Sequence, residues 1–82
     1  MARLPRNLGG VELIRRLGAL GYEATRQTSS HVRVTRTTPV GQHHVTVPTH
    51  KSLRVGTLNS ILADVAAHLG RDKDEVIAEL FG

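Results

Sequence analysis

The fold of this chain is decided by residues 31–47, which read HVRVTRTTPVGQHHVTV. Apolar and polar side chains alternate over residues 31–37 and again over residues 43–47, which is the period of a strand with one buried face. Between them, Pro39-Val40-Gly41 is typical of a turn. The stretch therefore predicts a hairpin with one apolar and one polar face. The apolar face carries Val32, Val34, Val45 and Val47, and the polar face carries His31, Arg33, His44 and Thr46.

The segments on either side predict one more strand and three helices. Residues 22–27 are expected to form the further strand, joined to the hairpin by a turn at 28–30. Apolar residues recur at helical spacing over residues 10–20 and, most strongly, over 55–69. A short last helix over residues 72–81 begins with an Asp and a Glu three positions later, a pattern that resembles a capping box. The order predicts an α+β fold, α-β-β-β-α with a short extra C-terminal helix, in which the helices cover the valine face.

Length and composition limit the class of protein. The chain has 82 residues and no Cys, which excludes a disulfide scaffold and a large α/β enzyme with a deep cleft. It has no apolar run long enough to span a membrane and no apolar segment typical of a signal peptide near its start, so we expect a cytoplasmic protein. Residues 1–8 are predicted to be a basic tail, and residues 9–82 a single domain.

The charge distribution favours a polyanionic partner. Residues 1–63 carry nine Lys or Arg and two Glu, and residues 24–63 contain no carboxylate at all. That acid-free stretch also holds four of the five His. A positive field of this kind attracts nucleic acid, the commonest polyanion in cells.

His31 is the strongest candidate for chemistry. It begins a strand on the predicted polar face, next to a Thr-Ser-Ser turn, and an imidazole can act as general base or acid near neutral pH. In RNA cleavage it would take the proton of a ribose 2′-OH, whose oxygen then attacks the adjacent phosphate. His50 is a weaker candidate for protonating the leaving oxygen. In one hairpin register that keeps the valines together His31 lies opposite Pro48, and in the other it lies opposite His50.

Basic side chains near His31 are candidates for binding the phosphates of RNA. A guanidinium or ammonium would stabilise the charge that develops on the phosphoryl oxygens. The candidate RNA contacts are Arg26, Ser30, Arg33, Lys51 and Arg54.

The sequence does not favour a metal or another cofactor. The spacing of the His residues matches no zinc pattern, and the acid-free stretch lacks the carboxylates that bind magnesium. Only two aromatic residues other than His, Tyr22 and Phe81, are present, which argues against a platform for stacking bases.

Four local patterns recur together in one known family. They are, in chain order, Gly21-Tyr22, residues 26–31, residues 45–50 and residues 55–62. In this order and spacing the chain resembles, over about residues 9–69, the HicA family of toxin–antitoxin ribonucleases. The resemblance implies a double-stranded-RNA-binding-domain-like fold and an endoribonuclease that cleaves mRNA and is inactivated by a HicB antitoxin.

The resemblance also assigns a role to His31. The catalytic His of the family lies in a Gly-Ser-His motif, which falls on Ser29-Ser30-His31. Two residues depart from the family pattern: Ser29 stands where Gly is usual, and Val55 where Pro is usual. If that Gly has a positive φ or allows RNA to approach the backbone, we expect Ser29 to reduce activity.

Two other functions explain the same charge pattern. A non-catalytic RNA-binding module of the same fold would bind RNA with a steep dependence on salt, and His31→Ala would leave RNA integrity unchanged. A protein-interaction domain would use its basic face to bind an acidic partner.

Overall fold

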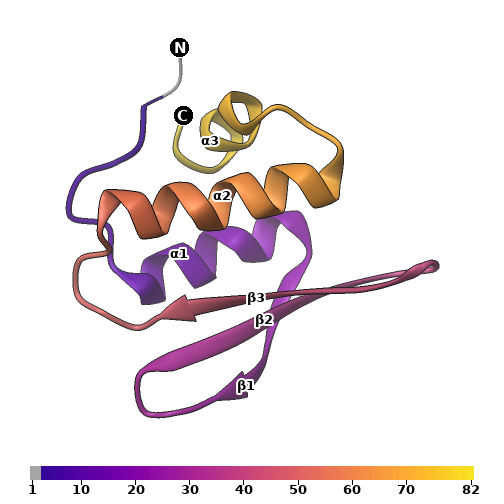
Figure 1. Ribbon diagram of the computed structural model, residues 1–82, viewed down its shortest axis with the longest axis horizontal. Coiled ribbons are helices and arrows are strands. Elements are labelled where there is room, and N and C mark those ends of the chain that lie inside the picture. The colour runs from indigo at the N-terminus through magenta and orange to yellow at the C-terminus, as the bar shows by residue number, and fades with distance from the viewer. Residues whose placement is uncertain (1–2) are drawn as a thin grey trace.

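The computed structural model describes residues 3–82, so Met1 and Ala2, at the start of the predicted tail, lie outside the described residues. The predicted order of elements is confirmed (Figure 1). The elements are α1 (Gly10–Leu17), the 3-10 turn η1 (Gly18–Leu20), β1 (Tyr22–Gln27), β2 (His31–Thr38), β3 (Gly41–Pro48), α2 (Val55–Leu69) and α3 (Lys73–Phe81).

The three strands form one antiparallel sheet in the order β1-β2-β3. Val34 pairs with Val45, and His31 pairs with Pro48. This is the first of the two registers considered from the sequence. Both of those registers bury all four hairpin valines on one face, whereas a shift by one residue would expose them. The observed register also pairs Thr38 with Gly41, so that Pro39 and Val40 form a tight two-residue turn.

The helices cover the valine face, as predicted. Figure 1 shows α1 and α2 on the same side of the sheet, with α3 beyond α2. Fully buried side chains from both layers fill the space between them, each contributing about 1.5–3 kcal/mol through the hydrophobic effect. The largest of these are Leu13, Leu17, Leu58, Leu62, Val34, Val47, Val65 and Val76. Among residues 3–82, no helix covers the opposite face of the sheet (Figure 1).

A β-bulge in β1 changes which side chains reach the open face. Ala24 pairs with Val34 and Arg26 pairs with Arg33, so Thr25 is an extra residue without a partner of its own. In a regular strand Arg26 would share the core face with Ala24. The bulge instead places Arg26 beside Arg33 on the open face.

The segment before α1 is packed against the loop that follows β3. The Gly10 N–H donates to the His50 carbonyl (3.0 Å), and the Leu53 N–H donates to the Leu8 carbonyl (2.7 Å). A Cβ atom at Gly10 would collide with the Pro48 carbonyl, so only glycine fits there. These contacts fix the β3–α2 loop relative to the end of the sheet.

The ends of the helices agree in part with the sequence. Gly21 and Gly70 terminate their helices with positive φ values of 93° and 66°, the conformation that glycine favours. Asp72 is at the N-cap of α3 as predicted, but its side chain makes no capping hydrogen bond. The expected capping box is therefore wrong in its contacts: Glu75 lies 3.9 Å from Arg71 instead. Within residues 3–82, no helix combines the length and apolar character needed to cross a membrane.

Candidate functional site

A shallow pocket of about 240 Å³ lies on the open face of the sheet. Its lining residues come from β1, the β1–β2 turn, β2 and β3, and are Arg26, Thr28, His31, Arg33 and Thr46. Three of the residues predicted from the sequence, Arg26, His31 and Arg33, are therefore brought together. Thr28 and Thr46 were not predicted as site residues, although turn chemistry and strand alternation placed them near His31.

The β1–β2 turn holds His31 through its backbone. The Thr28 N–H donates to the His31 carbonyl (2.9 Å), and the His31 N–H donates to the Thr28 hydroxyl (3.2 Å). The His31 ring is exposed, and its Nδ1 lies 2.9 Å from the Ser30 hydroxyl. Within residues 3–82, no hydrogen bond or ion pair joins this ring to a carboxylate. Nε2 has no hydrogen-bond partner among the described residues, and Ser30 is the side-chain partner of the ring.

The two pocket arginines carry charge that is not neutralised locally. Arg26 and Arg33 are cross-strand partners and both are exposed. Among the described residues, neither forms an ion pair with a carboxylate. Two positive charges on neighbouring residues repel each other unless an anion lies near them, so this surface favours a phosphate.

Ser29 fits the turn without backbone strain. In residues 3–82 the only non-glycine residue with a positive φ is Asn7 (57°). Ser29 therefore has an ordinary negative φ, and the turn does not require the glycine that is usual at this position. A positive φ is therefore no longer a reason to expect that Ser29 reduces activity.

His50, Lys51 and Arg54 lie outside the pocket, on the exposed loop between β3 and α2. This loop is tied to the turn before His31, because the Thr49 N–H donates to the Ser30 carbonyl (2.9 Å). The loop that carries these three exposed residues therefore lies at the same end of the sheet as the turn before His31.

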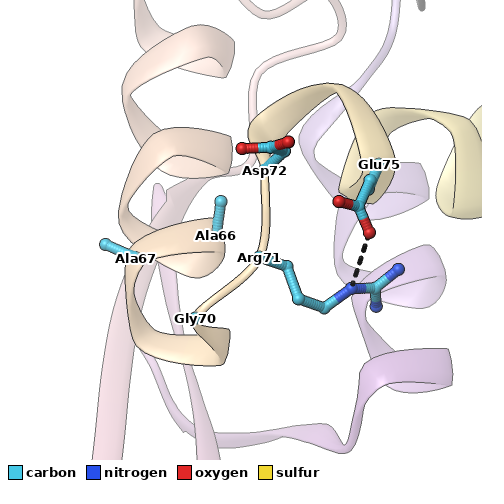
Figure 2. A pocket seen from close by; sticks show the side chains of 6 residues that line it. All are labelled: Ala66, Ala67, Gly70, Arg71, Asp72 and Glu75. Carbon is cyan, nitrogen blue, oxygen red and sulfur yellow. Dashed lines mark ion pairs between the residues drawn. The ribbon is translucent and has the colours of Figure 1, made fainter.

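A larger pocket, of about 510 Å³, lies where α2 meets α3. Figure 2 shows its lining residues, with Arg71 directed toward Glu75. Arg71 also forms an ion pair of 2.7 Å with Glu79. Because its one cation is already paired and Asp72 adds negative charge, this pocket does not favour a phosphate. The smaller pocket on the sheet is the better candidate site, since its cations are free and an imidazole is present.

A second group of titratable side chains, which we call the Tyr22 cluster, lies where β1, β2 and β3 meet α2. The Tyr22 hydroxyl is 2.8 Å from His43 Nδ1, and His43 Nε2 is 3.2 Å from Asp64. The His43 ring stacks on His68 at 4.2 Å. The fifth member, Arg36, donates from Nη1 to His68 Nε2 at 3.3 Å and from Nε to the Leu20 carbonyl at 2.9 Å.

The environment of the Tyr22 cluster changes the pKa of two members. Burial raises the pKa of Tyr22 to about 12, against the opposing effect of Arg36. Burial also lowers the pKa of His68, helped by the neighbouring His43 and Arg36. Tyr22 is only 2% exposed, so this cluster holds elements together and offers no open site.

The chain matches a known family over most of its length. The model of the HicA toxin of bacterial toxin–antitoxin systems matches residues 10–66, which run from the start of α1 into α2. No curated protein and no solved structure matched the chain. The match covers the sheet, the β1–β2 turn and His31, and the helix–strand order is that of the double-stranded-RNA-binding-domain-like fold of this family. The chain belongs to the HicA toxin family of bacterial toxin–antitoxin systems.

Proposed function

We propose that this protein is a toxin that cleaves mRNA in the cytoplasm without a metal ion, with His31 as the catalytic residue. The observation that carries the proposal is the position of His31 in a pocket with Arg26 and Arg33, with Nδ1 next to Ser30 and no partner for Nε2 among the described residues. An imidazole with one free nitrogen beside two unpaired cations suits proton transfer next to a phosphate. None of the described residues that line the pocket carries a carboxylate, so this lining offers little to a hard metal ion.

In the proposed reaction, His31 Nε2 takes the proton from a ribose 2′-OH. The 2′-oxygen then bonds to the adjacent phosphorus, the bond from phosphorus to the 5′-oxygen breaks, and that oxygen leaves with a proton. The products are a 2′,3′-cyclic phosphate and a 5′-hydroxyl. Arg26 and Arg33 stabilise the additional charge on the phosphoryl oxygens as the 2′-oxygen attacks.

We assign Ser30 the role of positioning the His31 ring. Its hydroxyl is 2.9 Å from Nδ1, and the partner of one ring nitrogen fixes the orientation and tautomer of the other. A hydroxyl is a weaker partner than the carboxylate of many catalytic histidines, which is consistent with a modest rate. Ser30 was first a candidate RNA contact, and its hydrogen bond to His31 favours the positioning role.

The exposed basic loop extends the proposed RNA surface. His50 remains the candidate for giving the proton to the leaving 5′-oxygen, because its loop is joined to the turn before His31 through Thr49 and Ser30. Lys51 and Arg54 are candidates for phosphates further along the strand. Their contribution is expected to weaken with salt, since counterions are released when phosphates are neutralised.

A HicB-like antitoxin is the proposed protein partner. An acidic inhibitor that covers the open face of the sheet would block His31 and neutralise Arg26 and Arg33 together. Both effects would stop cleavage without unfolding the toxin.

A non-catalytic RNA-binding module is the second candidate function. The absence of any carboxylate partner for the His31 ring within residues 3–82 favours it, because most catalytic histidines are oriented by an acid. The basic face would then bind RNA and leave it intact.

The deciding experiment is RNA cleavage by purified protein and by His31→Ala, both in EDTA, with the product ends identified. We expect the wild-type protein to leave 2′,3′-cyclic phosphate ends and His31→Ala to leave the RNA intact. Equal cleavage by both proteins would overturn the assignment of His31. RNA that is bound but not cleaved by the wild-type protein would favour the binding module.

A further inference from the structure

Apart from the phenol of Tyr22, Thr35 is the one buried polar side chain among residues 3–82, at 4% exposed. It lies in β2 on the open face of the sheet, on the same side as His31 and Arg33. Its hydroxyl is 2.7 Å from the Thr25 hydroxyl and 2.8 Å from His44 Nδ1. The bulge residue Thr25 is in turn 3.4 Å from the Arg33 carbonyl. The four groups form one continuous chain of hydrogen bonds.

The direction of this chain follows from its last member. A carbonyl oxygen can only accept, so Thr25 donates its single proton to Arg33. Thr35 must then donate to Thr25, and His44 Nδ1–H must donate to Thr35. If the chain ran in the opposite direction, Thr25 would donate its single proton to Thr35 and could not donate one to the Arg33 carbonyl. The complete chain therefore assigns the proton of a neutral His44 to Nδ1, which leaves Nε2 as an acceptor.

His44 is exposed on the open face, where an RNA strand would lie. It pairs with Thr35, which is four residues beyond His31 along β2, a separation of about 13 Å at the rise of a strand. No carboxylate among the described residues contacts its ring. His44 is therefore fixed on one side by Thr35 and open on the other, and it would meet a different nucleotide from the one at His31.

The chemistry of Nε2 selects what it can bind. Phosphate oxygens only accept hydrogen bonds, so a neutral Nε2 with a free lone pair has no partner there. Along the backbone of RNA, the only donor is the ribose 2′-OH, which is also the group that DNA lacks. We propose that His44 accepts a hydrogen bond from a ribose 2′-OH, so that the sheet selects RNA over DNA at a point remote from the pocket. This inference rests on the proposed function, because it takes RNA as the ligand.

The test compares the binding of an oligouridine with that of an oligodeoxyuridine of the same length. The bases are identical, so any difference in affinity comes from the ribose. All proteins carry His31→Ala so that neither strand is cut. We expect the parent to bind the RNA about three- to tenfold more tightly than the DNA, the range of one neutral hydrogen bond. Adding His44→Ala should bring this ratio close to one by weakening RNA binding alone.

Two threonine variants form a matched pair. Thr35→Val keeps the shape of the buried side chain and removes the hydroxyl that fixes His44, so it should also reduce the ratio. Thr37→Val alters an exposed threonine on the same strand and face, whose hydroxyl contacts Gln42 instead, and should leave the ratio unchanged. Thermal unfolding of each variant shows that it is folded. His44→Gln, whose amide oxygen accepts a hydrogen bond, should recover part of the ratio.

The outcomes separate this inference from the proposed function. A ratio that His44→Ala leaves unchanged overturns the role of His44, while cleavage by the protein with His31 intact still supports the ribonuclease. Equal affinity of the parent for both strands also overturns the role of His44. Failure to bind either strand, together with no cleavage by the protein with His31 intact, overturns both.

Discussion

Histidine side chains occupy two contrasting regions of this molecule, the pocket on the open face and the Tyr22 cluster on the helix side. In the pocket, the His31 ring is exposed, has one hydrogen-bond partner and lies beside two unpaired arginines. In the Tyr22 cluster, the His43 side chain is only 19% exposed and both of its ring nitrogens have partners, Tyr22 and Asp64. Among the described residues, His31 therefore has a ring nitrogen without a partner, whereas His43 has none.

The difference shows that partners, more than residue type, decide what a histidine does. A ring with both nitrogens in use holds neighbouring elements together, and it has no nitrogen left for a substrate. A ring held at Nδ1 alone can still exchange a proton at Nε2. Of the two regions, only the pocket combines such a ring with cations that a phosphate would neutralise.

The largest expected effect is that of His31→Ala on cleavage. Loss of the general base should lower the cleavage rate by about 10²–10⁴-fold, while the free energy of unfolding changes by less than about 0.5 kcal/mol because the side chain is exposed. Single-turnover cleavage in EDTA and urea unfolding measure the two quantities. A rate that falls less than tenfold would place the chemistry elsewhere.

His43→Ala should lower stability and leave cleavage unchanged, which is the reverse of the result expected for His31→Ala. It leaves the buried Tyr22 hydroxyl without its partner and removes the stacking on His68, so we expect a loss of about 1–3 kcal/mol in the free energy of unfolding. The cleavage rate of the folded protein should not change. His50→Ala, which removes an exposed histidine, is the control for stability. If His43→Ala lowers the free energy of unfolding no more than His50→Ala does, the Tyr22 cluster does not stabilise the fold.

The sheet could be predicted from the sequence because one of its faces is buried. The alternation over residues 31–37 and 43–47 assigns each side chain to a face, and burial of the valines then limits the register to two choices. His31 and Arg33 were placed on the open face by the same alternation. The resemblance to the HicA family, confirmed over residues 10–66, added the fold and the role expected of His31.

The contacts that complete the site could not be predicted from alternation. Arg26 faces the pocket only because of the bulge at Thr25, and the sole trace of that bulge in the sequence is the poor alternation of residues 22–27. The contact between Ser30 and His31 depends on the backbone angles of the turn and on two side-chain rotamers, which residue types do not fix. The capping box expected at Asp72 also depends on side-chain rotamers, and the Glu75 carboxylate lies near Arg71 instead.

The pH dependence of stability tests the Tyr22 cluster a second way. Burial, with His43 and Arg36, lowers the pKa of His68 in the folded protein below its ordinary 6.5, against the opposing effect of Asp64. The unfolded chain then binds a proton more readily than the folded one. The stabilisation from neutral His68 is therefore fully present above about pH 6.5 and is lost as the pH falls through the lower folded pKa.

Urea unfolding from about pH 8 to about pH 5 measures this loss. The groups that face His68 are Tyr22 from β1, Arg36 from β2, His43 from β3 and Asp64 from α2. His68→Gln keeps an acceptor for Arg36 and cannot titrate, so its stability should fall less over the same range. If the free energy of unfolding falls equally with pH in the two proteins, titration of His68 does not affect stability.

The smallest expected effect compares two neighbouring serines and sharpens the role of the pocket. Ser30→Ala removes the partner of His31 Nδ1 and should lower the cleavage rate by about two- to tenfold, the value of one neutral hydrogen bond. Ser29→Ala, one residue earlier in the same exposed turn, should leave the rate unchanged. Ser30→Thr keeps the hydroxyl and should recover most of the rate. Because Ser30 acts through His31, its loss should also shift the pH profile of cleavage, whereas a loss of RNA binding alone would raise KM and leave that profile in place.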